Sequence, residues 1–449
     1  MHPQKPIEKT GIISLSSLPS GAKIYINGKL YASHTPTILR DLKTGEYEIT
    51  LTADKFMPWK KTVPVMEGQA SVLEDILLIP KVWPKRIVTT RVFKKIIPVD
   101  EKALLLLPGD NTVQGIFVYR WSNPALSINL KNDNPASNEK IYPLFNAPVS
   151  PFPNELEDIF TMPESTHFLL KLRNTTDPEK IIYTWVDPLS TPASFTSSTD
   201  ISALFTNPPD KIFWSNDDED NIFTLNNNTV SRLDIKNQNL YPQIIKNIKG
   251  AGLRGRQIFV IDQSNHFNKF DYRQLKPETL TGDLDQLPKE FQDEQNYNID
   301  ILNDNMVVFL GLNGQLLWNN LPYMLIEQGC RGYLPVHQGR QIMVWTQNKI
   351  GIIDFTENRK EGIFETGPSV KWIIENGSDI TQAFLVNRGS QILFKDGSKV
   401  NLTDTELMYN RDISLITTTE SPIVYSDRAQ KLFYLDDKNQ QLNVIDILP

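Results

Sequence analysis

Histidine is the side chain best suited to proton transfer near neutral pH and to binding transition metals, so the histidines are the first candidates for chemistry. The chain has five, at His2, His34, His167, His266 and His337. No two lie within five residues of each other, and none belongs to a His-Glu-x-x-His or Cys/His pattern. We therefore expect solvated turn residues, as at His266, and predict no catalytic and no metal-binding residue among them.

The densest acidic cluster is Asp217-Asp218-Glu219-Asp220. A calcium loop spaces its oxygen ligands at alternate positions and needs a glycine for its sharp turn. Here the acids are contiguous, the glycine is absent, and the cluster separates two strand-like segments. We interpret it as a solvated hairpin tip.

Nucleophile and phosphate motifs are equally weak. Ser137-Asn138-Glu139-Lys140 matches Ser-x-x-Lys, in which a lysine one helical turn away activates a serine, but it lies in a loop without helical signals. No Gly-x-Ser-x-Gly elbow and no Gly-x-x-x-x-Gly-Lys-Ser/Thr loop occurs. The sequence predicts no catalytic residue and no cofactor.

Composition narrows the classes of protein further. The 449 residues carry a net charge of −7 and no basic run, which argues against nucleic acid as the main partner. One cysteine, Cys330, excludes an internal disulfide and any two-cysteine metal site. The longest apolar run, Ala103 to Leu107, is the length of a strand, and the first ten residues are too polar for a signal peptide.

The first eighty residues read as six short strands without helical periodicity. Alternation is clearest at Ala22, Ile24 and Ile26, and the following Asn27-Gly28 is the strongest short hairpin signal, because a type I′ turn needs positive φ at both central residues. These features predict an all-β fold that starts with a small β-sandwich at residues 10–80. About seventy residues carry only a thin core, so we expect the sandwich to be marginal alone or docked on its neighbour.

This region resembles the PEGA domain, which is named for Pro-Glu-Gly-Ala. The matching positions are Pro19, Gly21 and Ala22, then Asn27 and Gly28, Thr35 and Pro36, and finally Gly45 and Tyr47. The sequence departs from the family pattern at Ser20, at Thr44, where proline is common, and at Lys55-Phe56, where Gly-Tyr is usual. Strand faces and turns account for all these residues, so we assign them a structural role.

The surrounding residues are similar to a group of bacterial PEGA proteins in which one N-terminal membrane helix precedes the domain and a long β-rich region follows it. The resemblance implies an anchor before residue 1, absent from this sequence, and therefore a place on the extracytoplasmic side of the cell envelope. A natural soluble protein with its own start, and so a cytoplasmic location, is the alternative.

After a short proline-flanked linker, in which Trp83 is a candidate wedge between domains, one unit recurs through residues 81–449. It consists of an apolar strand, a polar turn, a second strand and often Asp, as in QIMVWTQNKIGIIDF and QILFKDGSKVNLTD. The spacing averages in the forties, which is typical of β-propeller blades. We predict a divergent propeller of seven or eight blades, leaning to eight, in which the first unit may instead complete the sheet of the last blade.

Several tryptophans fall at comparable places in or beside these hairpins, namely Trp121, Trp185, Trp214, Trp318, Trp345 and Trp372. They could form a glycan-stacking surface, but aromatics repeated once per unit more often pack between blades. We expect the packing role.

Three functional hypotheses follow. The favoured one is a non-enzymatic envelope protein whose PEGA module is a membrane-proximal spacer or docking element and whose propeller binds protein or cell-wall glycan. In this hypothesis the protein contacts the membrane only through the suspected N-terminal anchor. The second is a propeller enzyme, a lyase or hydrolase acting on cell-surface glycan. The third is a soluble scaffold that binds peptides.

Overall fold

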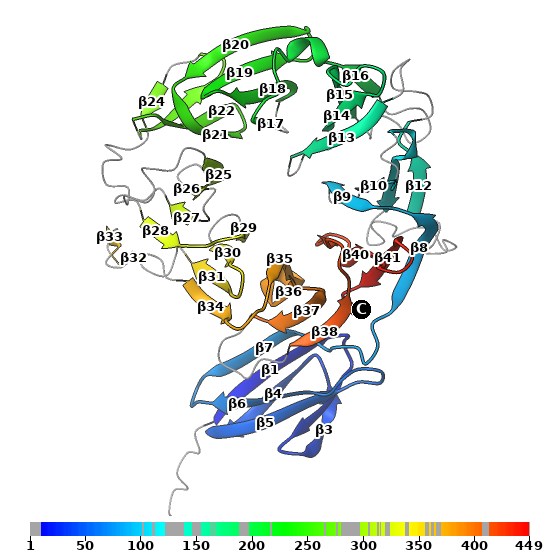
Figure 1. Ribbon diagram of the computed structural model, residues 1–449. Helices are drawn as coiled ribbons and strands as arrows, with labels where there is room; N and C mark the ends of the chain where they lie inside the picture. The colour runs from blue at the N-terminus through cyan, green and yellow to red at the C-terminus, as the bar shows by residue number, and fades with distance from the viewer. Residues whose placement is uncertain are drawn as a thin grey trace, which may run out of the picture. The chain divides into compact units, whose positions relative to one another are not determined.

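The structure is a computed structural model, and it describes most of the chain as β-strands (Figure 1). The described residues are 10–100, 103–109, 113–121, 139–145, 154–162, 165, 167–187, 197–215, 218–264, 266–274, 277–279, 297–303, 306–311, 314, 316–318, 324–336, 341–354, 359–360, 363–364, 370–405 and 413–448. Within these ranges there is no α-helix, only short 3-10 turns. The all-β prediction is confirmed.

The chain separates into two compact units. One unit comprises residues 1–90, 383–436 and 441–449, and the other comprises 91–382 and 437–440. The first unit therefore combines the N-terminal strands with the last strands of the chain.

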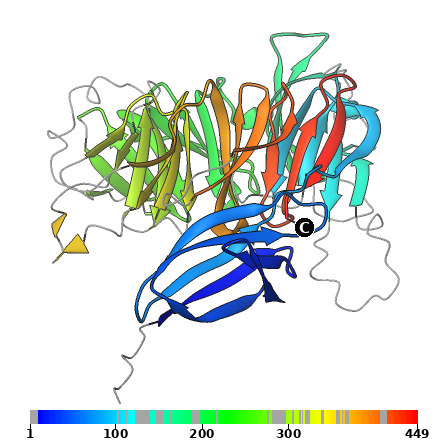
Figure 2. The same cartoon turned by 90° about the horizontal axis from the view of Figure 1, so that it is seen from below.

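The N-terminal sandwich, strands β1 to β7, lies in the first unit and is drawn in blue in Figure 2. One sheet has the order β4-β1-β7 and the other β3-β2-β5-β6. The strands are β1 (Thr10–Leu18), β2 (Lys23–Ile26), β3 (Lys29–His34), β4 (Thr37–Lys43), β5 (Gly45–Thr52), β6 (Trp59–Val65) and β7 (Ala70–Leu77).

Alternation in sequence becomes alternation in burial. In β1 every second residue is buried, including Ile13 and Leu15, because successive side chains of a strand point to opposite faces. These two meet Ile24, Ile49 and Val63 of the facing sheet in one core. The predicted small β-sandwich is thus present in the structure.

The sequence analysis missed β3. All six residues of this edge strand are exposed, including Leu30 and Tyr31, so it lacks the alternation by which half-buried strands are recognised. The Asn27-Gly28 turn, with φ of 48° and 77°, forces β3 to fold back beside β2. Turn geometry rather than burial creates this strand.

The remaining strands form four-stranded antiparallel sheets. The first three sheets contain β9 (Lys95–Asp100), β10 (Ala103–Leu107), β11 (Phe117–Trp121) and β12 (Glu139–Pro143); β13 (Asn154–Thr161), β14 (Phe168–Asn174), β15 (Ile181–Asp187) and β16 (Ser197–Asp200); and β17 (Lys211–Ser215), β18 (Asp218–Asn226), β19 (Thr229–Asp234) and β20 (Asn239–Lys246). Two further sheets contain β29 (Gly332–Val336), β30 (Gln341–Trp345), β31 (Ile350–Asp354) and β34 (Val370–Ile374); and β35 (Ile380–Val386), β36 (Gln391–Asp396), β37 (Lys399–Asp404) and β38 (Ser414–Thr418). Between β31 and β34, β32 (Arg359–Lys360) and β33 (Ile363–Phe364) form a small pair.

One larger sheet joins two such groups edge to edge. It contains β21 (Ile248–Arg254), β22 (Gln257–Asp262), β23 (Phe267–Asp271), β24 (Pro277–Thr279), β25 (Tyr297–Asn303), β26 (Met306–Gly311), β27 (Leu316–Trp318) and β28 (Met324–Glu327). The join is a parallel pairing of β21 with β25, where a Cβ at Gly252 would lie 2.3 Å from the Ile299 carbonyl oxygen. Glycine is needed there for the close approach. The number of blades stays a prediction.

The predicted repeat units are confirmed as hairpins. QIMVWTQNKIGIIDF forms β30 and β31, and QILFKDGSKVNLTD forms β36 and β37, the second and third strands of their sheets. In the second unit of the structure, buried clusters draw on two successive sheets at a time, as when Phe168 packs with Leu105.

The last sheet is completed from the start of the propeller region. Its order is β39-β40-β41-β8, with β39 (Val424–Ser426), β40 (Lys431–Leu435), β41 (Gln441–Asp446) and β8 (Lys85–Val92). The unit around Ala103 to Leu107 was the alternative for this role, but it forms its own sheet with β9, β11 and β12. The strand that completes the last sheet, β8, is mostly exposed and has no repeat signal.

Candidate functional site

The sandwich and the last sheets share a buried cluster, which we call the joint cluster. It contains Leu77, Trp83, Val386, Leu393, Val400, Leu402, Ile416, Ile423, Leu432, Tyr434, Ile445 and Ile447. Trp83 is the wedge that the linker sequence suggested, and Leu18 and Ile79 pack against the cluster from the sandwich side. The sandwich is thus docked on its neighbour, as its thin core led us to expect.

Polar contacts surround this joint. The Asn387 side-chain amide donates a 2.9 Å hydrogen bond to the Asp75 carbonyl, and the Lys85 ammonium donates a 2.8 Å bond to the Thr417 hydroxyl. Asn387 is buried with a φ of 51°, a left-handed conformation that asparagine tolerates better than most residues. The Asn387 bond ties β7 to the turn that precedes β36, and the Lys85 bond ties β8 to β38.

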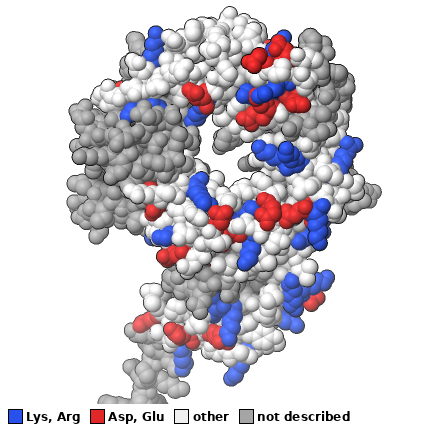
Figure 3. All heavy atoms as spheres, in the orientation of Figure 1, with Lys and Arg blue, Asp and Glu red and all other residues white. Residues whose placement is uncertain are grey.

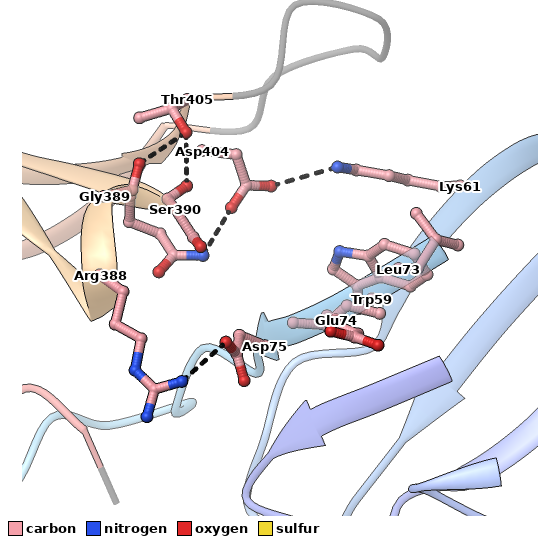
Figure 4. A pocket seen from close by; sticks show the side chains of 12 residues that line it. Trp59, Lys61, Leu73, Glu74, Asp75, Arg388, Gly389, Ser390, Asp404 and Thr405 are labelled. Atoms are coloured by element: carbon pink, nitrogen blue, oxygen red, sulfur yellow. Dashed lines mark hydrogen bonds and ion pairs between the residues drawn. The ribbon is translucent and has the colours of Figure 1, made fainter. Parts of the chain in front are cut away.

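Beside the joint lies a pocket of about 280 Å³, drawn in Figure 4. One wall comes from β6 and β7 of the sandwich, with Trp59, Lys61, Leu73, Glu74 and Asp75. The opposite wall comes from the turn Arg388–Ser390 and from the adjoining ends of β36 and β37. The pocket exists only because the two parts pack together.

Ion pairs cross the pocket. The Lys61 ammonium lies 3.4 Å from the Asp404 carboxylate, and the side chains are 10% and 33% exposed. The Arg388 guanidinium lies 4.0 Å from the carboxylate of Asp75 (Figure 4). The Lys61 ammonium also lies 5.4 Å from the centre of the Trp59 ring, within cation–π range. The two basic groups therefore face carboxylates, which leaves Glu74 as the carboxylate in excess.

Gln391 links the pocket to a repeated feature of the propeller region. Its side-chain amide donates to the Asp404 carboxylate at 3.2 Å, across the β36–β37 pair. Gln341 donates to Asp354 at 2.6 Å at the same place in β30 and β31. The Asp that ends many of the repeat units is thus a cross-strand acceptor that closes the hairpin.

Sequence reasoning missed this pocket. Its two walls are more than three hundred residues apart in the sequence, and no residue of either wall belongs to a recognised motif. The signal that was available, the Asp that often ends a repeat unit, marks the same cross-strand pair at Asp354 and does not single out Asp404.

The histidines lie in different places. His34 is exposed at the end of β3, and His266 lies just before β23 with its Nδ1 3.3 Å from Asp262. His167 is not a solvated turn residue, since its ring stacks on Trp185 with centroids 5.2 Å apart. His2 and His337 lie outside the described residues.

The acidic cluster does not separate the two strands as expected, because Asp218, Glu219 and Asp220 are the first residues of β18, and Asp218 is not solvated. Its side chain is 14% exposed and accepts hydrogen bonds from the Tyr272 hydroxyl and the Asn221 amide. Burial alone would raise the pKa of Asp218, but the hydrogen bonds from Tyr272 and Asn221 and the charge of Arg273 lower it. Burial, together with the hydrogen bond to Asp218, raises the pKa of Tyr272 to about 12. The expected solvated tip is therefore wrong for Asp218, which joins neighbouring hairpins.

The other candidate residues that can be placed have structural roles. Ser137 and Asn138 lie outside the described residues, and the lysine of that motif falls on strand β12 rather than on a helix. Trp185 and Trp214, from successive sheets, pack edge to face with ring centroids 5.1 Å apart, which confirms packing for this pair. In the described part of the chain no three His, Cys, Asp or Glu side chains are placed to share a metal ion.

The residues of the PEGA resemblance hold the sandwich together. Thr35 is buried, and its hydroxyl accepts a 3.0 Å bond from the Ala22 amide and lies 2.6 Å from the Ser17 hydroxyl. The Gly21 amide donates to the Thr35 carbonyl at 2.7 Å. The Tyr47 hydroxyl donates to the Lys43 carbonyl, bridging the turn that contains Gly45.

The remaining matching positions are turn residues. Pro19 and Pro36 both follow cis peptide bonds. The Asn27 side chain accepts from the Glu48 amide at 2.8 Å, beside Gly28 in the hairpin turn. These motif residues therefore lie in the turns and strand contacts of the sandwich.

Charge on the molecular face drawn in Figure 3 is mixed, with acidic and basic side chains interspersed. Among the residues that can be placed, no helix has the length and apolar character that a bilayer span requires.

Comparisons with known proteins agree with this architecture. The model of the PEGA domain matches residues 10–74. No curated protein has significant similarity to the chain.

Among solved structures, the C-terminal WD40 domain of Sif2 superposes with a TM-score of 0.51 at 10% identity, covering 82% of this chain and 99% of that one. The β-propeller domain of Cps50 (Swd1) from Myceliophteria thermophila (TM-score 0.39, 11% identity) covers 63% of this chain and 93% of that one. PorZ, described as an essential bacterial surface component of the type-IX secretion system of Porphyromonas gingivalis, covers 78% and 42% (TM-score 0.39, 9% identity). At these identities the likeness concerns the fold alone, and only the first superposition is close enough to support it.

The chain carries a PEGA domain at residues 10–74, and the strands beyond it have the β-propeller fold.

Proposed function

We propose that this protein is a non-enzymatic binding platform on the extracytoplasmic side of a bacterial cell envelope. In this proposal the PEGA domain is a membrane-proximal spacer, and the propeller presents the surface that binds protein or cell-wall glycan. The observation that supports the proposal is that β1 runs from the free end of the PEGA domain to the joint with the last propeller sheets.

Strand β1 spans the PEGA domain from its free end to the joint. At its start, Thr10 pairs with Lys43 and accepts a hydrogen bond from the Gly68 amide, in a region without propeller contacts among the contacts described. At its other end, Leu18 packs against the joint cluster. Nine residues of strand extend about 30 Å. An anchor that precedes β1 would therefore hold the last propeller sheets about one domain length from the membrane.

The packed joint supports a spacer rather than a loose tether. A flexible linker would let the last propeller sheets move independently of the PEGA domain, whereas the joint cluster and the Asn387 hydrogen bond fix them to it. A rigid spacer of this kind holds the last sheets at a fixed distance from the bilayer.

Reporter fusions to the full-length gene test the proposal. An alkaline phosphatase that matures only outside the cytoplasm, fused after Pro449, should be active and should sediment with membranes. A β-galactosidase fused at the same place should be inactive. The reverse pattern, with both fusions in the soluble cytoplasmic fraction, would refute the envelope location.

A further inference from the structure

The pocket beside the joint cluster offers hydrogen-bonding groups whose charges are paired across it, except for that of Glu74. Lys61 faces Asp404, and Arg388 faces Asp75, so each ion pair presents a donor beside an acceptor. At the Lys61–Asp404 pair, an anionic ligand would have to displace Asp404 and a cationic ligand would have to displace Lys61. A neutral ligand needs neither exchange.

A hydroxyl group both donates and accepts, so neighbouring hydroxyls suit paired donors and acceptors of this kind. Gln391 adds a further acceptor: it is 3% exposed, and its carbonyl oxygen has no hydrogen-bond donor in the structure. Buried acceptors are normally satisfied, so a donor from water or from a ligand is expected there.

The wall opposite Gln391 is partly apolar. Trp59 and Leu73 line it, and an aromatic ring provides a flat surface for the C–H face of a sugar ring. The volume of about 280 Å³ is at the lower limit for small-molecule sites, so it suits one ring rather than a long polymer segment.

From these features we infer that the pocket between the PEGA domain and the β35–β38 sheet binds one neutral sugar unit of a glycan. The inference rests on the proposed binding role and gives it a place: the ligand is held at the joint, by residues of both parts. Lys61, Asp404 and Gln391 contact the hydroxyls, and Trp59 contacts the ring face.

Three pyranoses of the same ring but different charge test this inference on the full chain. The probes are N-acetylglucosamine (neutral), glucosamine (cationic) and glucuronate (anionic), measured by saturation-transfer NMR and by titration calorimetry. We expect the neutral sugar to bind with a millimolar dissociation constant and the two charged sugars to bind at least about tenfold more weakly. No binding of the neutral sugar at 50 mM, or equal binding of all three, overturns the inference.

Variants then place the binding in the pocket. Asp404→Asn should weaken binding of N-acetylglucosamine about tenfold, a loss of about 1.4 kcal/mol. Asp354→Asn removes the same cross-strand acceptor from β30 and β31, whose residues do not line the pocket, and should leave binding unchanged. If both variants bind as the unaltered chain does, the sugar binds elsewhere and the pocket is not the site.

Circular dichroism of each variant shows whether it is folded. If Asp404→Asn does not fold, Lys61→Met, which keeps most of the side-chain stem, replaces it in the same comparison. The reporter fusions are scored separately, so a failure of sugar binding leaves the envelope location standing, and a cytoplasmic location leaves the pocket result standing.

Discussion

Replacement of Trp83 by alanine should loosen the attachment of the PEGA domain to the propeller. Trp83 is 7% exposed and packs in the joint cluster with Leu77 and the apolar residues of the last sheets. A tryptophan buries about 150–250 Å². At about 25 cal/mol per Å², this corresponds to about 4–6 kcal/mol. The usual loss for a buried tryptophan replaced by alanine, about 3–5 kcal/mol, overlaps this range.

Denaturant unfolding of the full chain measures this loss. We expect the transition that reports on the PEGA domain and the last sheets to move to lower denaturant by an amount equivalent to about 3–5 kcal/mol. Limited proteolysis should in addition cut the linker around Pro80 to Pro84 faster in the variant, because the linker is held by Trp83.

Val82→Ala is the matched control. Val82 is the adjacent residue of the same linker, but it is 82% exposed, so its replacement should change stability by less than about 0.5 kcal/mol. If Trp83→Ala and Val82→Ala have the same small effect on stability and on proteolysis, the joint cluster does not attach the two parts and the reasoning is refuted.

Two further substitutions test individual contacts. Thr35→Val removes the hydroxyl that meets Ala22 and Ser17, and should destabilise the protein by about 1–3 kcal/mol in thermal unfolding; an unchanged midpoint would contradict the role given to this hydroxyl. The lowered pKa of Asp218 adds stability that is present above about pH 4 and is lost as the pH falls through the lowered value. Tyr272→Phe removes one cause of that lowering, so acid unfolding should begin at higher pH; an identical acid transition in both proteins would count against the hydrogen bond.

The raised pKa of Tyr272 has the opposite pH dependence. Its contribution is present below about pH 10 and is lost as the pH rises towards 12, because the unfolded chain releases the proton first. The phenylalanine variant should lack this part of the alkaline destabilisation, which the same unfolding series extended to pH 11 measures.

Much of the fold could be predicted from local pattern. Period-two alternation at Ala22, Ile24 and Ile26 placed β2, and the Asn27-Gly28 pair predicted a turn whose positive φ values the structure contains. Strands β3 and β8 could not be predicted in this way. Both are exposed edge strands. Because neither face is buried, their sequences do not alternate between apolar and polar residues.

The candidate site was not predictable for a different reason. Lys61 and Asp404 are separated by more than three hundred residues and meet because the PEGA domain packs on the last sheets. Local sequence determines strands and turns, since these depend on neighbours within a few residues. Which distant residues come together depends on how whole sheets pack.

By itself, the sequence therefore determined the class of fold, the PEGA domain with its structural motif residues, and the repeated hairpins that end in Asp. Only the tertiary structure decided that β8 completes the last sheet, that Trp83 is buried in the joint cluster, and that Asp218 is engaged rather than solvated. The physical reason is common to all three. Each depends on contacts between segments far apart in the chain, for which no spacing along the sequence carries a signal.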